Sequence, residues 1–477
     1  MPGAYEHDIR ETLANPRLQA AVYTATARLA SHRRAAVDAA ALPDYQELRT
    51  QANLVKKHTI ENLDFYLEQF AANSAAHGAT VVWARDGADV VQFLADLARR
   101  NKAKLFVKSK SMTTEEIDLN EHLEHEGLEP VETDLGEFII QLARQRPYHI
   151  VAPALHMTRF DVADLFSDKL GVPRETEIER QTKIARAVLR RRFLAADIGI
   201  SGANFLVADS GSVVLVENEG NARLTTTAPR IHVAVAGIEK MIPRAQDLAV
   251  FLKLLGRSGT GQPLTVYTSF LTGPRRAAEI DGPEELYVVL LDNGRSRLLA
   301  DREKRQSLYC IRCGACLNHC PVYRKIGGHN YPWVYSGPIG ATISPQYRGI
   351  ERDPWLPFAS SLCGACLEVC PVKIDLPKLL LDLRAEVNQL PPKDARSRLE
   401  RAGFRCWSWV MRHPRVYEML GLMASAILPG GNGWVAKLPG LLNAGPAQAW
   451  TSERDLPPVT RSFRQMWRER KTTGERP

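Results

Sequence analysis

The 477-residue sequence lacks several patterns that would place it in a common class of protein. No window holds eighteen uninterrupted apolar residues, so no membrane-spanning helix is predicted. Neither G-x-G-x-x-G nor G-x4-G-K-S/T follows a predicted strand, so the sequence indicates no dinucleotide or nucleoside triphosphate site. The first residues show no charged segment followed by an apolar one, and we therefore expect a cytoplasmic protein.

Neither sign of charge dominates the sequence. The chain has 62 Lys and Arg against 54 Asp and Glu, a net charge of +8. Basic residues are scattered or lie near predicted helices, without the long runs interleaved with aromatic residues that suit nucleic acid. Nucleic acid is therefore not an expected partner. The length and the 45% hydrophobic content are typical of a globular protein with two or three domains.

Cysteine is limited to eight residues, yet seven of them fall in two short runs that each end in Cys-Pro. The first run is Cys310, Cys313, Cys316 and Cys320, and the second is Cys363, Cys366 and Cys370. The first run has the C-x2-C-x2-C-x3-C-P spacing of bacterial ferredoxins, which bind two 4Fe-4S clusters. Disulfides would need an oxidising compartment, which nothing in the sequence suggests. Zinc sites use C-x2-C pairs, but not a third cysteine two residues further on followed by x3-C-P. We therefore predict iron-sulfur clusters.

The two runs form an internal repeat, because Cys-Gly-Ala-Cys-x3-Cys-Pro occurs in both. In ferredoxins the fourth cysteine of each run reaches the other cluster. The repeat thus predicts an exchange of ligands between the two halves. Cluster one is expected to use Cys310, Cys313, Cys316 and Cys370, and cluster two to use Cys320, Cys363 and Cys366.

Cluster two lacks an evident fourth thiolate, because Ser360 stands where the first run has Cys310. Three outcomes are open. It is a 4Fe-4S cluster with a non-cysteine or exchangeable ligand at one iron, it is a 3Fe-4S cluster, or Cys406 completes it. We favour the first, since Cys406 lies in an apolar context where a lone cysteine is usually a buried hydrophobe. His329 is a weaker candidate for a substitute ligand and more simply a hydrogen-bonding residue.

Upstream of the cysteines, helices over residues 1–70 precede short apolar strands that alternate with helices. Such alternation predicts right-handed crossovers and a largely parallel sheet covered on both faces. The expected strands are 80–84, 104–108, 129–132, 149–152, 198–209, 212–217, 230–236, 264–270 and 285–291. The expected helices between them are 88–100, 115–126, 135–145 and 246–255, with a glycine-rich connector at 256–261 and a further helix at 298–307.

Two polar segments of this α/β region are candidate ligand sites. Glu217, Glu219 and Arg223 follow a predicted hairpin, and polar clusters at strand ends are where α/β sheets bind ligands. The alternative is a hydrated loop network. Residues 109–115 form a polar loop before a helix, which either receives an anion or only caps that helix. No residue is assigned a catalytic role.

Two later segments are candidates for contact with partners. Residues 327–357 are rich in glycine, proline and aromatic residues and are expected to be a long loop that covers the clusters or docks a partner. After residue 393 a basic stretch precedes an apolar one that contains Trp407 and Trp409. We interpret this segment as an arm that docks a partner or touches a membrane surface.

The order of these parts resembles the lactate utilisation protein B family of iron-sulfur proteins. The two cysteine runs carry the resemblance together with residues 202–212 and 218–221, and it covers almost the whole chain. It implies a helical segment at 1–70, a LUD-type α/β domain at 71–297 similar to isomerase and CoA-transferase sheets, an α-helical ferredoxin-like two-cluster domain at 298–392, and a helical family-specific segment at 393–477. In that family the pattern of seven cysteines and a serine is normal.

The resemblance implies a role in oxidising L-lactate to pyruvate with two companion proteins, in support of growth on lactate. This chain would be the iron-sulfur electron-transfer subunit of that oxidoreductase system. Whether lactate binds here or in a companion is left open by the sequence. Two alternatives remain, namely a dehydratase-like enzyme that uses the three-cysteine cluster as a Lewis acid, with Glu217 or Arg223 orienting substrate, and a non-enzymatic redox-sensing scaffold.

Overall fold

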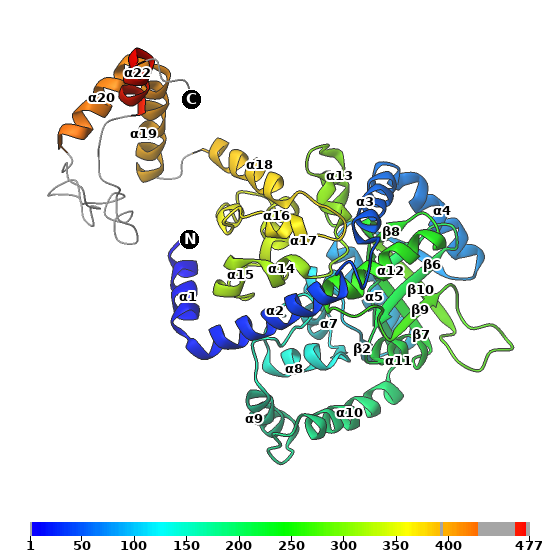
Figure 1. Ribbon diagram of the computed structural model, residues 1–477. Coiled ribbons are helices and arrows are strands. Elements are labelled where there is room, and N and C mark those ends of the chain that lie inside the picture. Colours follow the sequence, from blue (N-terminus) through cyan, green and yellow to red (C-terminus); the bar gives the residue numbers. More distant parts are fainter. Residues whose placement is uncertain (1, 392–394, 428–462, 474–477) are drawn as a thin grey trace. The chain divides into compact units, whose positions relative to one another are not determined.

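The computed structural model describes residues 2–391, 395–427 and 463–473 (Figure 1). The chain divides into two compact units, Met1–Gln389 and Leu390–Pro477. The first unit contains the N-terminal helices, the α/β region and the cysteine runs in a single body. The described residues of the second unit form helices.

Four helices open the first unit: α1 (Pro2–Ala14), α2 (Pro16–Ala36), α3 (Tyr45–Glu61) and α4 (Leu63–Ala76). These helices agree with the helical segment expected over residues 1–70, and α3 and α4 are separated at Asn62, which lies outside the helical conformation. Ile60, Leu67 and Phe70 recur at helical intervals and are buried. Helix α2 lies against α14 (Ala315–His319) and α15 (Pro321–Ile326), so the N-terminal helices support the cysteine-containing segment (Figure 1).

A six-stranded sheet forms the centre of the α/β region (Figure 1). Its strands, in spatial order, are β1 (Thr80–Ala84), β10 (Glu285–Leu291), β7 (Ile231–Gly237), β4 (Ile198–Ser201), β2 (Leu105–Lys108) and β3 (Glu129–Glu132). All five strand pairs are parallel, as predicted. Separate apolar clusters cover its two faces, so β7 is buried along its whole length.

The helices that connect or cover the strands of this sheet include α5 (Gly87–Asn101), α7 (Leu119–His125), α8 (Leu135–Ala143), α9 (Arg159–Leu170), α10 (Ile178–Ala195) and α11 (Asn221–Thr227). The helix expected over 115–126 is instead two helices, because α6 (Met112–Glu116) ends before Asp118, whose φ of 48° is left-handed. The other predicted helices at 88–100 and 135–145 lie within two residues of α5 and α8.

A second, four-stranded sheet has the order β8 (Met241–Ile242), β5 (Phe205–Val207), β6 (Ser212–Glu217) and β9 (Tyr267–Leu271). The predicted hairpin is present, with β5 antiparallel to β6. The long strand expected over 198–209 is wrong, because β4 belongs to the first sheet and β5 to the second. Helix α12 (Ala245–Gly259) includes most of the expected glycine connector.

The strand expected over 149–152 is absent, since these residues form bends. The His149 ring explains the difference. Its Nδ1 accepts hydrogen bonds from the backbone N–H groups of Val151 (3.0 Å) and Ala152 (3.2 Å), which turns the chain back on itself. Its Nε2 lies 3.1 Å from Asn318 Oδ1, so the same ring ties this segment to the cysteine-containing region.

The cysteine-containing region is built from short helices. After α13 (Arg295–Ala300) it contains α14, α15, α16 (Gly337–Arg348), α17 (Ala365–Val369) and α18 (Leu376–Gln389), with 3-10 turns at Arg305–Tyr309 and Leu356–Phe358. The helix expected over 298–307 is therefore a helix and a separate turn. The expected loop at 327–357 contains α16, which is mostly buried. One apolar core runs from the N-terminal helices through both sheets into this region.

The second unit contains α19 (Ala395–Arg412), α20 (Pro414–Ile427) and α22 (Phe463–Thr473). Trp407 and Trp409 on α19 are exposed, and so is Cys406. The expectation that Cys406 is buried is therefore wrong. Within the residues that the structure describes, no helix combines the length and apolar character needed to cross a bilayer. The expected docking arm includes residues 428–462, which lie outside the described part of the chain.

Candidate functional site

The two cysteine runs meet around one small cavity. Cys310, Cys313 and Cys316 line it together with Cys370 from the second run, and its remaining wall is largely apolar. These are the four residues that the repeat assigns to cluster one. Each thiol is free of disulfide bonds. Among the described residues, no three His, Cys, Asp or Glu side chains are grouped closely enough to hold a single metal ion.

Burial governs the chemistry of these thiols. It raises the pKa of Cys313 to about 12 and that of Cys370 to about 11. Cys320 and Cys366 are also buried, and the pKa of Cys366 is raised to about 12 by burial and then by the nearby Cys320 thiol. Metal coordination is the usual way in which such buried sulfurs become thiolates. Cys363 is exposed, so the second group of cysteines reaches the protein surface.

The backbone repeats the same turn in both halves. Arg312 N–H donates to Cys310 Sγ (3.4 Å), and Leu362 N–H donates to Ser360 Oγ (3.2 Å). Both donor residues have left-handed backbones, with φ values of 58° and 54°. Such strain in non-glycine residues persists only where the surroundings impose it. The Ser360 hydroxyl therefore occupies, in the second turn, the place that the Cys310 thiol has in the first.

Buried cations surround the first group of cysteines. Arg49 Nε donates to the Cys370 carbonyl (2.9 Å), and Arg33 Nη2 donates to the Val369 carbonyl (3.2 Å). Lys56 is fully buried and donates to the backbone carbonyls of Glu239 and Met241. Burial lowers the pKa of Lys56 to about 7. Arg33 and Arg49 therefore place positive charge beside the Cys370 segment, which favours an anionic group, such as a thiolate-ligated cluster, at the cysteines.

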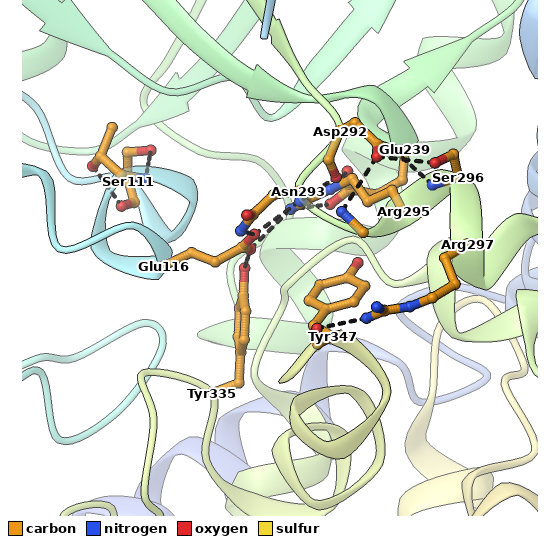
Figure 2. Close-up of polar contacts among 12 residues, drawn as sticks. Ser111, Glu116, Glu239, Asp292, Asn293, Arg295, Ser296, Arg297, Tyr335 and Tyr347 are labelled. Atoms are coloured by element: carbon orange, nitrogen blue, oxygen red, sulfur yellow. Dashed lines mark hydrogen bonds and ion pairs between the residues drawn. The ribbon is translucent and has the colours of Figure 1, made fainter. Parts of the chain in front are cut away.

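Figure 2 shows the Glu116, Glu239, Arg295 and Tyr335 side chains of a buried ion network. The network also reaches Arg312 in the first cysteine turn. Arg295 holds Glu116 in a two-pronged pair, with both N–O distances 2.8 Å, and also pairs with Glu239. Tyr335 donates to Glu116 Oε2 (2.7 Å), and Arg312 lies 3.4 Å from Glu239 Oε1. Burial opposes ionisation of Glu239, but Arg295 and Arg312 outweigh it and lower its pKa to about 2.

This network was not predicted. Glu116 and Arg295 are 179 positions apart in the chain, and no local pattern distinguishes them from surface residues. The only available signal was the position of Arg312 between two cluster cysteines. In the structure Arg312 lies over the Tyr335 ring, 4.5 Å from its centre. The Arg312 side chain is therefore held by Glu239 of the α/β region and by Tyr335 of the cysteine-containing region.

A larger cavity of about 340 Å³ adjoins the first cysteine group. Its wall includes residues 109–113 after β2, residues 215–219 at the end of β6, Lys240, and the turn from Ile311 to Cys313. Both polar segments that the sequence singled out thus face one cavity, which the Cys313 residue also borders. Ser111 Oγ accepts the Thr114 N–H (3.3 Å), so the 109–115 loop also caps α6.

The three residues proposed at the hairpin end behave differently. Glu217 and Glu219 line the cavity, whereas Arg223 does not and lies over the Tyr267 ring. Glu217 accepts hydrogen bonds from the backbone N–H groups of Ala222 (2.7 Å) and Arg223 (2.8 Å). It therefore caps the first turn of α11 (Asn221–Thr227). Neither role matches the expected use of Glu217 or Arg223 to orient substrate.

Glu219 lies at the cavity mouth, where solvent still reaches the residue. Partial burial and the nearby Asp134 carboxylate raise its pKa to about 7, against a weaker opposing effect from the Leu135 N–H and from Lys110. The pKa of the Glu219 carboxyl group therefore lies close to neutral pH. Lys240 lies deeper and is 8% exposed. Burial lowers the pKa of Lys240 to about 8.

The remaining ligand candidates lie elsewhere. His329 Nε2 bonds to the Arg146 carbonyl (2.7 Å), and its ring packs against those of Tyr148 and His156. This is the hydrogen-bonding role that the sequence favoured for His329. Cys406 belongs to the second unit and is exposed on α19.

Three family models match consecutive parts of the chain. Residues 67–291 match the LUD domain, residues 306–374 a 4Fe-4S dicluster domain, and residues 383–472 the C-terminal domain of lactate utilisation protein B. Lactate utilization protein B of Bacillus licheniformis is 43% identical over 99% of this chain and 98% of its own. The protein of the same name from Bacillus subtilis is 42% identical over 99% and 97%.

This chain belongs to the lactate utilization protein B family. Its α/β region is the LUD domain of that family, with the parallel sheet at its centre. Its cysteine runs lie within the 4Fe-4S dicluster domain. A crystal structure of a DUF162 family protein from Deinococcus radiodurans covers 48% of this chain and 98% of its own, at 10% identity and a TM-score of 0.27. That likeness is too weak to support an argument.

Proposed function

We propose that this family member is the iron-sulfur electron-transfer subunit of an L-lactate oxidation system. The observation that carries the proposal is the arrangement of the cysteines. One group lines a buried cavity beside a ligand-sized cavity, and the other reaches the surface at Cys363. Such an arrangement suits a path that takes electrons from the interior and delivers them to a partner. The lactate substrate is suggested by the name of the relatives.

The cysteines fit two 4Fe-4S clusters, which pass single electrons when bound. In the proposal Cys310, Cys313, Cys316 and Cys370 hold cluster one, and Cys320, Cys363 and Cys366 hold cluster two. Ile374 N–H donates to Cys370 Sγ and Tyr323 N–H to Cys320 Sγ, both at 3.4 Å. Hydrogen bonds of this kind to ligand sulfurs set cluster potentials.

The fourth ligand of cluster two is assigned to Ser360 in this proposal. Support comes from the matched turns, in which Ser360 Oγ and Cys310 Sγ accept the same type of backbone hydrogen bond. An oxygen ligand at one iron agrees with the first of the three outcomes considered from the sequence. Cys406 has no comparable support, because it is not part of either turn.

Two companion proteins complete the proposed system, one of which accepts the electrons. The exposed Cys363 edge of the first unit is the natural contact for such a partner, since electron tunnelling requires close approach. A dehydratase role is less well supported. The ligand-sized cavity adjoins the group of four cysteines, whereas an open iron would belong to the group of three.

The test is lactate-dependent reduction of the purified chain under anaerobic conditions. The cluster-loaded protein is mixed with its two companions and L-lactate, and the clusters are followed by EPR. We expect reduced 4Fe-4S signals that require lactate and all three proteins. Spectral shifts without reduction would instead favour the Lewis-acid enzyme, and no response to lactate would favour the redox-sensing scaffold.

A further inference from the structure

We propose that the cavity between the LUD-domain sheet and the first cysteine group binds a small 2-hydroxy or 2-oxo carboxylate, with Lys240 as the partner of its carboxylate. The choice of this class rests on the proposed function. The existence of an anion site rests on the cavity itself. It adjoins the cysteines assigned to cluster one and is distinct from the cluster-two site.

Lys240 is the first argument for an anionic ligand. It is 8% exposed, lines the cavity, and has no hydrogen-bond or ion-pair partner among the described residues. The neighbouring Glu239 carboxylate does not satisfy it, because Arg295 and Arg312 occupy that group. A buried charge without a partner is costly, so such groups are normally paired or bind a ligand. A carboxylate that enters the cavity would supply the missing partner.

Lys110 gives the second argument, because it places another cation in the same wall. Its Nζ is buried and has no hydrogen-bond partner in the described structure. The wall also carries the carboxylates of Asp134, Glu217 and Glu219, of which Glu217 is taken up by two backbone N–H groups. An anion is therefore expected at the two lysines, contributed by the loop after β2 and the turn before β8, and not throughout the cavity. An anion between them would also be held from both the LUD-domain sheet and its second sheet.

The size and composition of the wall limit the ligand further. At about 340 Å³ the cavity is near the small end of ligand sites. None of its lining residues is aromatic, so it offers no surface on which a flavin or quinone ring would stack. Thr113, Asn204 and Asn221 add hydroxyl and amide groups that suit the oxygen at carbon 2.

The position of Cys313 ties the cavity to electron transfer. Cys313 lines both this cavity and the cavity shared by the four cysteines. Gly259 packs against the same turn, where an added Cβ would lie 2.9 Å from the Cys313 carbonyl oxygen. A ligand in the larger cavity would therefore contact the turn that carries a proposed ligand of cluster one.

Binding is tested by calorimetry on the cluster-loaded full-length chain, with L-lactate, pyruvate and propionate as ligands at pH 7. We expect L-lactate and pyruvate to bind at one site and propionate, which lacks an oxygen at carbon 2, to bind more weakly. Lys240→Met should weaken binding roughly tenfold to a hundredfold, because it removes a charge-assisted hydrogen bond. Lys183→Met is the control, since Lys183 is exposed on α10 and outside the cavity.

Glu219→Gln gives a second and independent test. Asp134, Lys110 and Glu217 are the charged groups that act on Glu219, and protonation of Glu219 removes a negative charge from the mouth of the site. Affinity for an anion should therefore rise as the pH falls from 8 to 6. At pH 8 the Glu219→Gln variant should bind L-lactate more tightly than the unmodified chain does. At pH 6 the difference in affinity between the two proteins should be smaller. A loss of folding would not produce that gain.

The outcomes separate this inference from the proposed function. In one outcome the three-protein mixture reduces the clusters with lactate, but this chain alone binds no carboxylate and Lys240→Met reduces the clusters as the unmodified chain does. The proposed function then stands, and the carboxylate site is refuted. Equal binding of propionate and L-lactate would refute the assigned class. Lysine-dependent binding without any lactate-dependent reduction would support the site and refute the electron-transfer role.

Discussion

Replacement of Arg295 by methionine tests whether the buried ion network holds the first cysteine turn in place. The Arg295, Glu116 and Glu239 side chains are almost fully buried. Arg295→Met would leave two buried carboxylates facing each other without their main cation. Removal of one partner from a buried ion pair costs about 3–5 kcal/mol. We expect a loss of that order in the free energy of unfolding, and earlier loss of the clusters because Arg312 is anchored through Glu239.

Arg297→Met is the matched control (Figure 2). Arg297 lies on the same helix, is exposed, and donates to the carbonyls of Gln346 (3.1 Å) and Tyr347 (2.7 Å). Its loss should cost about 1 kcal/mol. Urea unfolding under anaerobic conditions, followed by fluorescence and by cluster absorbance, measures both variants. Adding Glu116→Gln to Arg295→Met should recover part of the stability, because one buried charge disappears. Equal midpoints for Arg295→Met and Arg297→Met would refute the reasoning.

Two further predictions concern His149 and Ser360. Burial lowers the pKa of His149 to about 3, so below pH 6.5 the unfolded chain takes up a proton that the folded chain does not. As the pH is lowered below about 6.5, this residue should decrease the free energy of unfolding by at most about 1.4 kcal/mol per pH unit. The urea midpoint of His149→Gln should therefore fall less steeply with decreasing pH than that of the unmodified chain. An equal slope for the two proteins would contradict this prediction. Ser360→Cys should supply a fourth thiolate and alter the EPR spectrum and potential of one cluster, whereas Ser361→Cys, on its exposed neighbour, should alter neither.

The parallel sheet was predictable because its strands are short apolar runs separated by helices of sufficient length. Thr80–Ala84 and Glu285–Leu291 show this pattern clearly and occur at the predicted places. The segment 149–152 has the same apolar character, but the His149 ring accepts two backbone hydrogen bonds and contacts Asn318, so it forms a turn. That outcome depends on a residue 169 positions away, which no local pattern reveals.

The cysteine runs could be found from spacing alone, because cluster ligands must recur at short intervals in a tight loop. The cavity beside them could not. Residues 109–113 and 217–219 were each recognised as polar segments near strand ends, yet their convergence with Lys240 and Cys313 requires both sheets and the cysteine-containing region to come together. The ion network around Arg295 was missed for the same reason, since its partners come from distant segments that only the folded chain brings together.

The exchange of ligands between the two halves is the central claim, and single serine substitutions test it most directly. Cys310→Ser, Cys370→Ser and Cys363→Ser are prepared anaerobically and compared by EPR, with iron and sulfide content as the control for loading. The account predicts that Cys310→Ser and Cys370→Ser alter the signal of one cluster, and that Cys363→Ser alters the signal of the other. If Cys370→Ser instead altered the same signal as Cys363→Ser, with the Cys310→Ser signal distinct, each half would hold its own cluster and the account would be contradicted.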